Sequence, residues 1–159
     1  EAPMGARNLS WMPCWSAAEV SVDRDTGQVT VHKLVVGSDP GRALNKQVCH
    51  GQVEGAAIQA FAQAMFEELR YRGEAPENAT PLTYRVPRYR DIPEFFESFI
   101  AEHRQSRGPG GLKGIGEAGM LGIAAAIANA IEDATGASLT AAPFTPEKVL
   151  AALDALSGK

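Results

Sequence analysis

The feature that most constrains this chain is a glycine-rich segment that runs directly into a long apolar pattern. Six glycines occur within residues 108–119, and residues 118–135 are rich in alanine and isoleucine. Glycine loses more conformational entropy on folding than any other residue, so such a cluster is typical of tight turns or of backbone that approaches a ligand closely. The apolar pattern predicts a helix over residues 118–135 that is buried on most sides and ends at Gly136.

Composition sets broad limits on fold and location. The 159 residues are enough for one domain, over residues 1–159, with its own core. A net charge of −4 disfavours nucleic acid as the main partner, and no apolar run is long enough to span a membrane. The two cysteines, Cys14 and Cys49, form no disulfide framework. We therefore expect a reducing, cytoplasmic location, with the periplasm left open.

The first half of the chain predicts a hairpin followed by a helix. Residues 16–23 and 28–36 alternate between apolar and polar side chains around an Asp- and Gly-containing turn at residues 24–27. Residues 38–48 predict a loop. Apolar residues recur at helical spacing over residues 51–71, and Gly73 is expected to end that helix.

The second half predicts two short strands and two helices. The strands are expected at residues 83–86 and 94–101, after a polar loop. The last helix is expected to begin at Thr145, because threonine is a good N-cap and Pro146 suits the first turn. The order of elements, ββαββαα, predicts an α+β domain in which helices pack on a small mixed sheet.

Residues 114–119 match the pattern G-x-G-x-x-G. A dinucleotide fingerprint needs a buried strand that leads directly into the first glycine, whereas residues 107–113 predict a loop. An acid at Glu117 would also face the pyrophosphate. A nicotinamide or flavin site in this motif is therefore disfavoured, although an amide-rich loop before a helix still suits an anionic group.

Glu117 and Lys113 are the only charged residues within residues 108–119. Glu117 is either a surface acid that favours the helix dipole or a general base, whose pKa burial in a tight pocket would raise towards a useful range. Lys113 is either a solvated loop charge or a group that binds a phosphate or another anion of a ligand.

A second segment, Gly51-Gln52-Val53-Glu54-Gly55, also places polar side chains between glycines. It is either a helix start with Glu54 in the first turn, or a site where the Gln52 amide, which both donates and accepts, hydrogen-bonds a cofactor. The neighbouring Cys49 and His50 lack the spacing of a metal site, so we do not expect a metal ligated by protein side chains.

Together these segments resemble the C-terminal part of the molybdenum-binding subunit of the xanthine dehydrogenase/aldehyde oxidase family of molybdenum hydroxylases. The segments that carry the resemblance follow the family's order along the chain. They are residues 18–23 with 26–27, 39–45, 51–55, 113–117, 126–131 and 143–150. The resemblance implies a fold similar to the C-terminal part of that family's molybdopterin-binding domain.

The resemblance also implies roles for individual residues. Glu117 is expected to be the general base that takes the proton from a molybdenum-bound hydroxide during oxidation of an aldehyde or N-heteroaromatic carbon, with water as the oxygen source. Gln52 is expected to hydrogen-bond the pterin. The other residues expected to contact the cofactor are Gly51, Lys113, Gly114 and Gly116.

The implied cofactor is molybdenum–molybdopterin, with its cytosine dinucleotide form left open, and 2Fe-2S clusters and FAD are expected on partner chains. Ala56 stands where many family members have a glycine. The chain is far shorter than a complete molybdenum subunit, so we expect a split subunit, a processed chain or a fragment that is active only with the remaining polypeptide. The alternative is a non-catalytic cofactor-binding or assembly module of the same fold.

Overall fold

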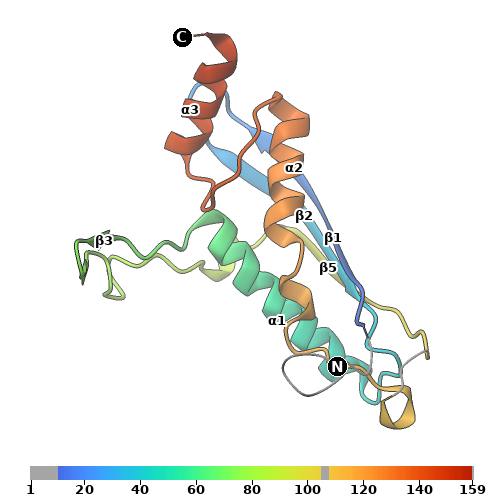
Figure 1. Cartoon of the computed structure of the whole chain (residues 1–159). Helices are drawn as coiled ribbons and strands as arrows, with labels where there is room; N and C mark the ends of the chain where they lie inside the picture. The colour runs from blue at the N-terminus through green and yellow to red at the C-terminus, as the bar shows by residue number, and fades with distance from the viewer. Residues whose placement is uncertain (1–10, 105–107, 159) are drawn as a thin grey trace, which may run out of the picture.

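A three-stranded mixed sheet with helices packed on one face forms the centre of the molecule (Figure 1). The computed structural model describes residues 11–104 and 108–158. The sheet has the order β1-β2-β5. Its strands are β1 (Cys14–Val22), β2 (Val29–Ser38) and β5 (Phe95–Ile100), and the long helices are α1 (Lys46–Met65), α2 (Ile123–Thr135) and α3 (Pro146–Ser157). The predicted α+β class with a small mixed sheet is confirmed.

The predicted hairpin is the antiparallel pair β1–β2. Its turn forms because the Asp23 carboxylate accepts the amides of Asp25 and Thr26, at 2.9 and 3.1 Å, and because Gly27 adopts a φ of 71°. Strand β5 then pairs with β2 in the parallel direction. Parallel pairing requires a crossover connection, and α1 lies within it.

Helix α1 occupies a different span from the predicted residues 51–71. It begins five residues earlier because the Asn45 side chain accepts the Val48 amide at 3.1 Å and so caps it. It ends at Met65, and the Phe144 amide donates to the Ala64 carbonyl near its C-terminus at 2.7 Å. Gly73 does not end this helix. It lies instead, with a φ of 62°, between two short strands.

Those short strands form an exposed arm, and the strand predicted at residues 83–86 is absent. The arm consists of β3 (Tyr71–Arg72) and β4 (Ala75–Pro76), and Figure 1 shows it projecting from the body. The buried Asn78 holds its base, since its amide accepts from Arg70 and donates to the Glu68 carbonyl. Residues 81–84 form turns instead of a strand, and the Tyr84 hydroxyl donates a hydrogen bond to the Glu67 carboxylate.

The glycine-rich segment forms two single 3₁₀ turns rather than the first part of α2. These are η2 (Pro109–Gly111) and η3 (Ala118–Met120). Helix α2 starts only at Ile123, because Gly122, with a φ of 86°, separates it from η3. The expectation that this helix is buried on most sides is wrong for the described chain: one stripe of isoleucines is buried, and Ala125 is exposed. Helix α3 starts as predicted, with Thr145 accepting the Lys148 amide.

Candidate functional site

The two glycine-containing segments meet where η3 packs on α1. A Cβ atom at Gly119 would lie 2.1 Å from the Val53 carbonyl oxygen, so the backbone of η3 touches the backbone of α1 at that point. Both contacting residues are buried. Gln52 precedes Val53, and Glu117 lies two residues before Gly119. The fold therefore brings Gln52 and Glu117, which are 65 positions apart in the sequence, to one corner of the molecule.

Four further glycines, two on α1 and two in the loop before η3, have no steric partner within the described chain. A Cβ atom at Gly51, Gly55, Gly114 or Gly116 would meet no atom within 4 Å. None of the four has a positive φ, so their backbone conformation does not require glycine either. Glycine where the described residues impose no need for it fits a group from outside that approaches the backbone closely. Gln52 is exposed beside these glycines.

Glu117 is exposed and lies at the N-cap of η3, where its side chain makes no capping hydrogen bond. Glu117 is therefore a surface residue in the described chain, but helix α2 begins six residues later, so Glu117 is not in the first turn of that helix. The expected burial is not provided by the described residues. Its side chain is instead exposed to solvent.

Lys113 is neither solvated nor free. Its side chain is 6% exposed, and its ammonium donates to the Asp39 carboxylate at 3.0 Å. The amides of His103 and Gly41 also donate to Asp39, at 3.0 and 2.9 Å. Burial acts to raise the pKa of Asp39, but these two amides and Lys113 outweigh it and hold the pKa below its ordinary value. The predicted contact of Lys113 with the cofactor stays a prediction.

A hydrogen-bonded chain that the sequence did not reveal sets the rotation of α1 against β5. The Ser98 hydroxyl donates to the Glu54 carboxylate at 2.7 Å, and Ser98 Oγ lies 2.6 Å from His50 Nδ1. Since His50 and Glu54 are four residues apart, both lie on the face of α1 that meets β5. Helix α1 already begins at Lys46, so residues 51–55 lie beyond its first turn and the interpretation of this segment as a helix start is wrong.

The dinucleotide interpretation of residues 114–119 fits the geometry poorly. The described residues directly before Gly114, 108–113, contain a 3₁₀ turn and an isolated bridge but no strand, so the G-x-G-x-x-G match lacks the strand–turn–helix geometry of a dinucleotide site. Within residues 11–104 and 108–158, no group of three or more His, Cys, Asp or Glu side chains is arranged to hold a metal ion. Across the same residues, no helix combines the length and apolar character needed to cross a membrane.

Comparison with known proteins identifies the family of the chain. Residues 1–93 match the family model described as the molybdopterin cofactor-binding domain. The chain is 38% identical over 138 residues to the probable hypoxanthine oxidase XdhD of Escherichia coli, and 36% identical over 138 residues to the aldehyde oxidoreductase of Megalodesulfovibrio gigas. These alignments cover 86% and 87% of this chain, but only 14% and 15% of the relatives.

Solved structures give the same result. The aldehyde oxidoreductase from Desulfovibrio gigas superposes with a TM-score of 0.81 at 35% identity, over 90% of this chain and 15% of that one. The Cu,Mo-CO dehydrogenase superposes with a TM-score of 0.78 at 26% identity, over 87% of this chain and 18% of that one. The chain therefore belongs to the molybdopterin cofactor-binding domain family, and its relatives are molybdenum-binding subunits of xanthine and aldehyde oxidoreductases.

Proposed function

We propose that this chain forms part of the active site of a molybdenum hydroxylase, and that Glu117 is its general base. The observation that supports the proposal is the contact of Gly119 with Val53, which brings the segment that carries Glu117 against the helix that carries Gln52. The chain corresponds to only 14% and 15% of the two relatives named above, so the activity belongs to an assembly with the remaining polypeptide.

The open glycines would hold the molybdopterin group along the exposed side of α1 and the loop before η3. Gly51 and Gly55 lie one helical turn apart on α1, and Gly114 and Gly116 lie in the loop before η3, so backbone rather than side-chain atoms would approach the cofactor. The Gln52 amide would donate to and accept from the pterin. When bound, the cofactor supplies the two-electron oxidation and the water-derived oxygen.

Glu117 would accept the proton released as the substrate carbon is oxidised. Its side chain makes no capping hydrogen bond in η3, so its oxygens are available to a group in the corner. Contact with the remaining polypeptide would cover this carboxylate and exclude water from the groups around it. The substrate class supported by the relatives is an aldehyde or an N-heteroaromatic ring.

The open face of the sheet gives the remaining molybdenum-subunit polypeptide a surface to cover. Trp15, Phe95 and Phe99 point to this face and are 44%, 46% and 48% exposed. Trp15 and Phe99 are the neighbours of Gly37 on the two adjacent strands, and the missing side chain of Gly37 makes room for the indole.

We further propose that 2Fe-2S clusters and FAD lie on partner chains and that the pterin is carried with or without a cytosine dinucleotide.

The test replaces Glu117 in the assembled enzyme. Glu117→Gln should lower kcat by on the order of 10²–10⁴-fold, because the amide cannot accept the proton, while molybdenum content stays at the wild-type level. The control is Glu74→Gln, an exposed acid on the β3–β4 arm, which Figure 1 shows projecting from the body. Wild-type turnover in a molybdenum-replete Glu117→Gln enzyme would contradict the proposal and favour the non-catalytic cofactor-binding or assembly module.

A further inference from the structure

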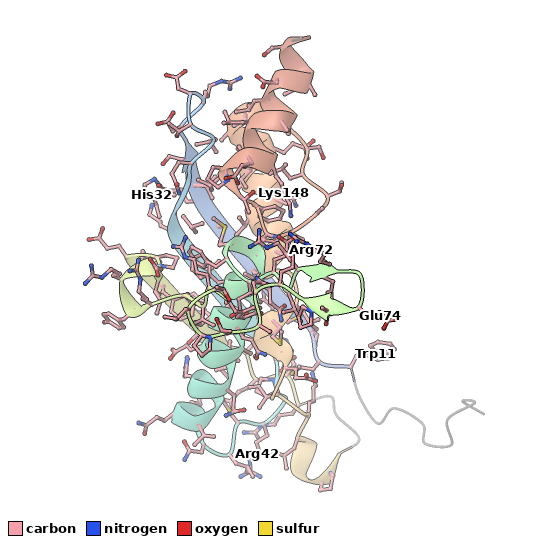
Figure 2. The ribbon with its side chains drawn as sticks, turned by 90° about the vertical axis from the view of Figure 1, so that its left-hand side faces the viewer. Trp11, His32, Arg42, Arg72, Glu74 and Lys148 are labelled. Atoms are coloured by element: carbon pink, nitrogen blue, oxygen red, sulfur yellow. The ribbon has the colours of Figure 1, made fainter. Side chains whose placement is uncertain are left out.

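The loop that follows β2 is hydrogen-bonded to residues 111–113 of the glycine-rich segment. The Arg42 amide donates to the Gly111 carbonyl at 3.0 Å, and the Lys113 amide donates to the Pro40 carbonyl at 2.8 Å. Between these two hydrogen bonds Gly41 pairs with Leu112 as an isolated antiparallel bridge. Figure 2 labels Arg42 at this end of the molecule, beside η2. Residues 111–113 therefore have a fixed backbone position.

A buried ion pair between Asp39 and Lys113 links the same two segments through their side chains. Both side chains are 6% exposed, and Nζ lies 3.0 Å from Oδ2. The other oxygen, Oδ1, is occupied by the amides of Gly41 and His103. Asp39 thus receives one hydrogen bond from each of three separate parts of the chain. A buried pair with these additional hydrogen bonds is far more ordered than an exposed one.

Glu117 lies between two such fixed points. Lys113 is four residues before it and Gly119, held against Val53, is two residues after it. Four residues of extended chain reach at most about 14 Å, so the position of Lys113 limits where Glu117 can lie. Gly114 and Gly116 stand between them, and glycines widen the range of conformations that an untethered segment would sample. Both anchors are therefore needed to hold the carboxylate in one place.

We infer that the buried Asp39–Lys113 ion pair is a positioning device that holds the loop carrying Glu117 at the cofactor corner, and that Lys113 acts through Asp39 rather than as a ligand of the cofactor's phosphate. This inference rests on the proposed role of Glu117. Asp39 and Lys113 are both positioning residues, because neither touches the reacting atoms. Misplacing a catalytic group by about 1 Å can cost as much as 10²-fold in rate, so the pair has a measurable effect on turnover.

The test compares Lys113→Met, Lys113→Arg and Lys148→Met in the assembled enzyme. Lys148 is the control, since it pairs at 3.5 Å with Glu68, and Figure 2 labels it well away from Arg42 and the junction that Lys113 joins. We expect Lys113→Met to lower kcat about 10–100-fold, with KM and molybdenum content near wild type. Lys113→Arg keeps the charge and should recover most of the rate, and Lys148→Met should have no effect.

A second readout does not depend on turnover. Hydrogen–deuterium exchange at the hydrogen-bonded amides of Ala118, Met120 and Leu121 should accelerate in Lys113→Met, because losing the first anchor loosens the turn beyond it. Unchanged exchange and unchanged kcat, in an enzyme that Glu117→Gln still inactivates, would overturn the positioning role alone. A fall in molybdenum content would overturn it in favour of a cofactor-binding lysine. Full activity of Glu117→Gln would instead refute the proposed function, and exchange would still decide whether the pair holds the loop.

Discussion

Replacing Gly119 by alanine tests the contact that assembles the site. The added Cβ would lie 2.1 Å from the Val53 carbonyl oxygen and 3.0 Å from its Cα, whereas real Cβ atoms essentially never approach closer than 3.0 Å. The turn η3 must therefore retreat by about 0.9 Å, since the obstacle is helix backbone and not a flexible side chain. Overpacking in a core costs about 1–3 kcal/mol, and a backbone obstacle places this substitution near the upper end.

The assay is urea unfolding of Gly119→Ala beside Gly116→Ala. Gly116 is the matched control because its Cβ would meet nothing within 4 Å and its φ is not positive. We expect Gly119→Ala to lower the free energy of unfolding by about 3 kcal/mol. Gly116→Ala should change it by less than about 1 kcal/mol, in the stabilising direction, because alanine restricts the unfolded chain.

The molybdenum content of the assembled enzyme tests Gly116→Ala separately from the stability of the chain. Gly116→Ala places a methyl group in the open corner, so the assembled enzyme should retain less molybdenum although the fold is intact. Equal stability of Gly119→Ala and wild type would refute the argument that Val53 fixes η3. Normal molybdenum content in Gly116→Ala would refute the interpretation of the open glycines as a cofactor cradle.

Two further predictions follow from the ion pair and from the open face of the sheet. The pKa of Asp39 is lowered in the folded state, so its contribution to stability is complete above the ordinary carboxyl pKa of 3.8 and is lost as the pH falls through the lower, folded value. Asp39→Asn should therefore reduce stability at neutral pH and flatten the loss of stability below about pH 4, as measured by thermal unfolding against pH; an unchanged acid limb would contradict this. Phe99→Ser should leave unfolding of the chain nearly unchanged but weaken binding of the remaining molybdenum-subunit polypeptide by on the order of tenfold, in a titration with the purified polypeptide. Leu156→Ser, at an apolar residue of α3 that is 57% exposed, is the control, and equal effects of the two variants would refute a specific interface.

Elements with strong local patterns were predicted correctly. The β1–β2 hairpin has alternating side chains and a turn closed by Asp23, and α3 has Thr145 and Pro146 at its start, so each is specified by neighbours in the sequence. Residues 94–101 predicted β5 to within one residue at each end. Local propensity was enough in these places because tertiary contacts reinforced it.

The boundaries of α1 could not be read from periodicity. Asn45 caps the helix from within a segment whose proline and glycine predicted a loop, so five helical residues were missed. At the other end Leu69 continues the apolar spacing, but the chain leaves the helix at Phe66 to form the exposed arm. Helix ends depend on single capping contacts, which a periodic pattern does not contain.

The candidate site was visible in the sequence only as separate pieces. Glycine spacing identified residues 51–55 and 113–119, but not that Gly119 rests on Val53. The partner of Lys113 lies 74 residues away, so the sequence did not show that its side chain is buried against Asp39 rather than solvated. The hydrogen-bonded chain through Ser98 likewise joins two elements that are distant in sequence.

Because β2 and β5 pair in parallel, the hydrogen bonds that hold Asp39 and Lys113 depend on a contact between distant parts of the chain. The hairpin and α1 can form from local contacts, but β5 can join β2 only after the intervening residues, which include α1 and the β3–β4 arm, close into a loop. Asp39 follows β2, and the amide of His103, just beyond β5, is one of its donors. The set of hydrogen bonds that holds Asp39, and with it Lys113, is therefore complete only once β5 has paired with β2.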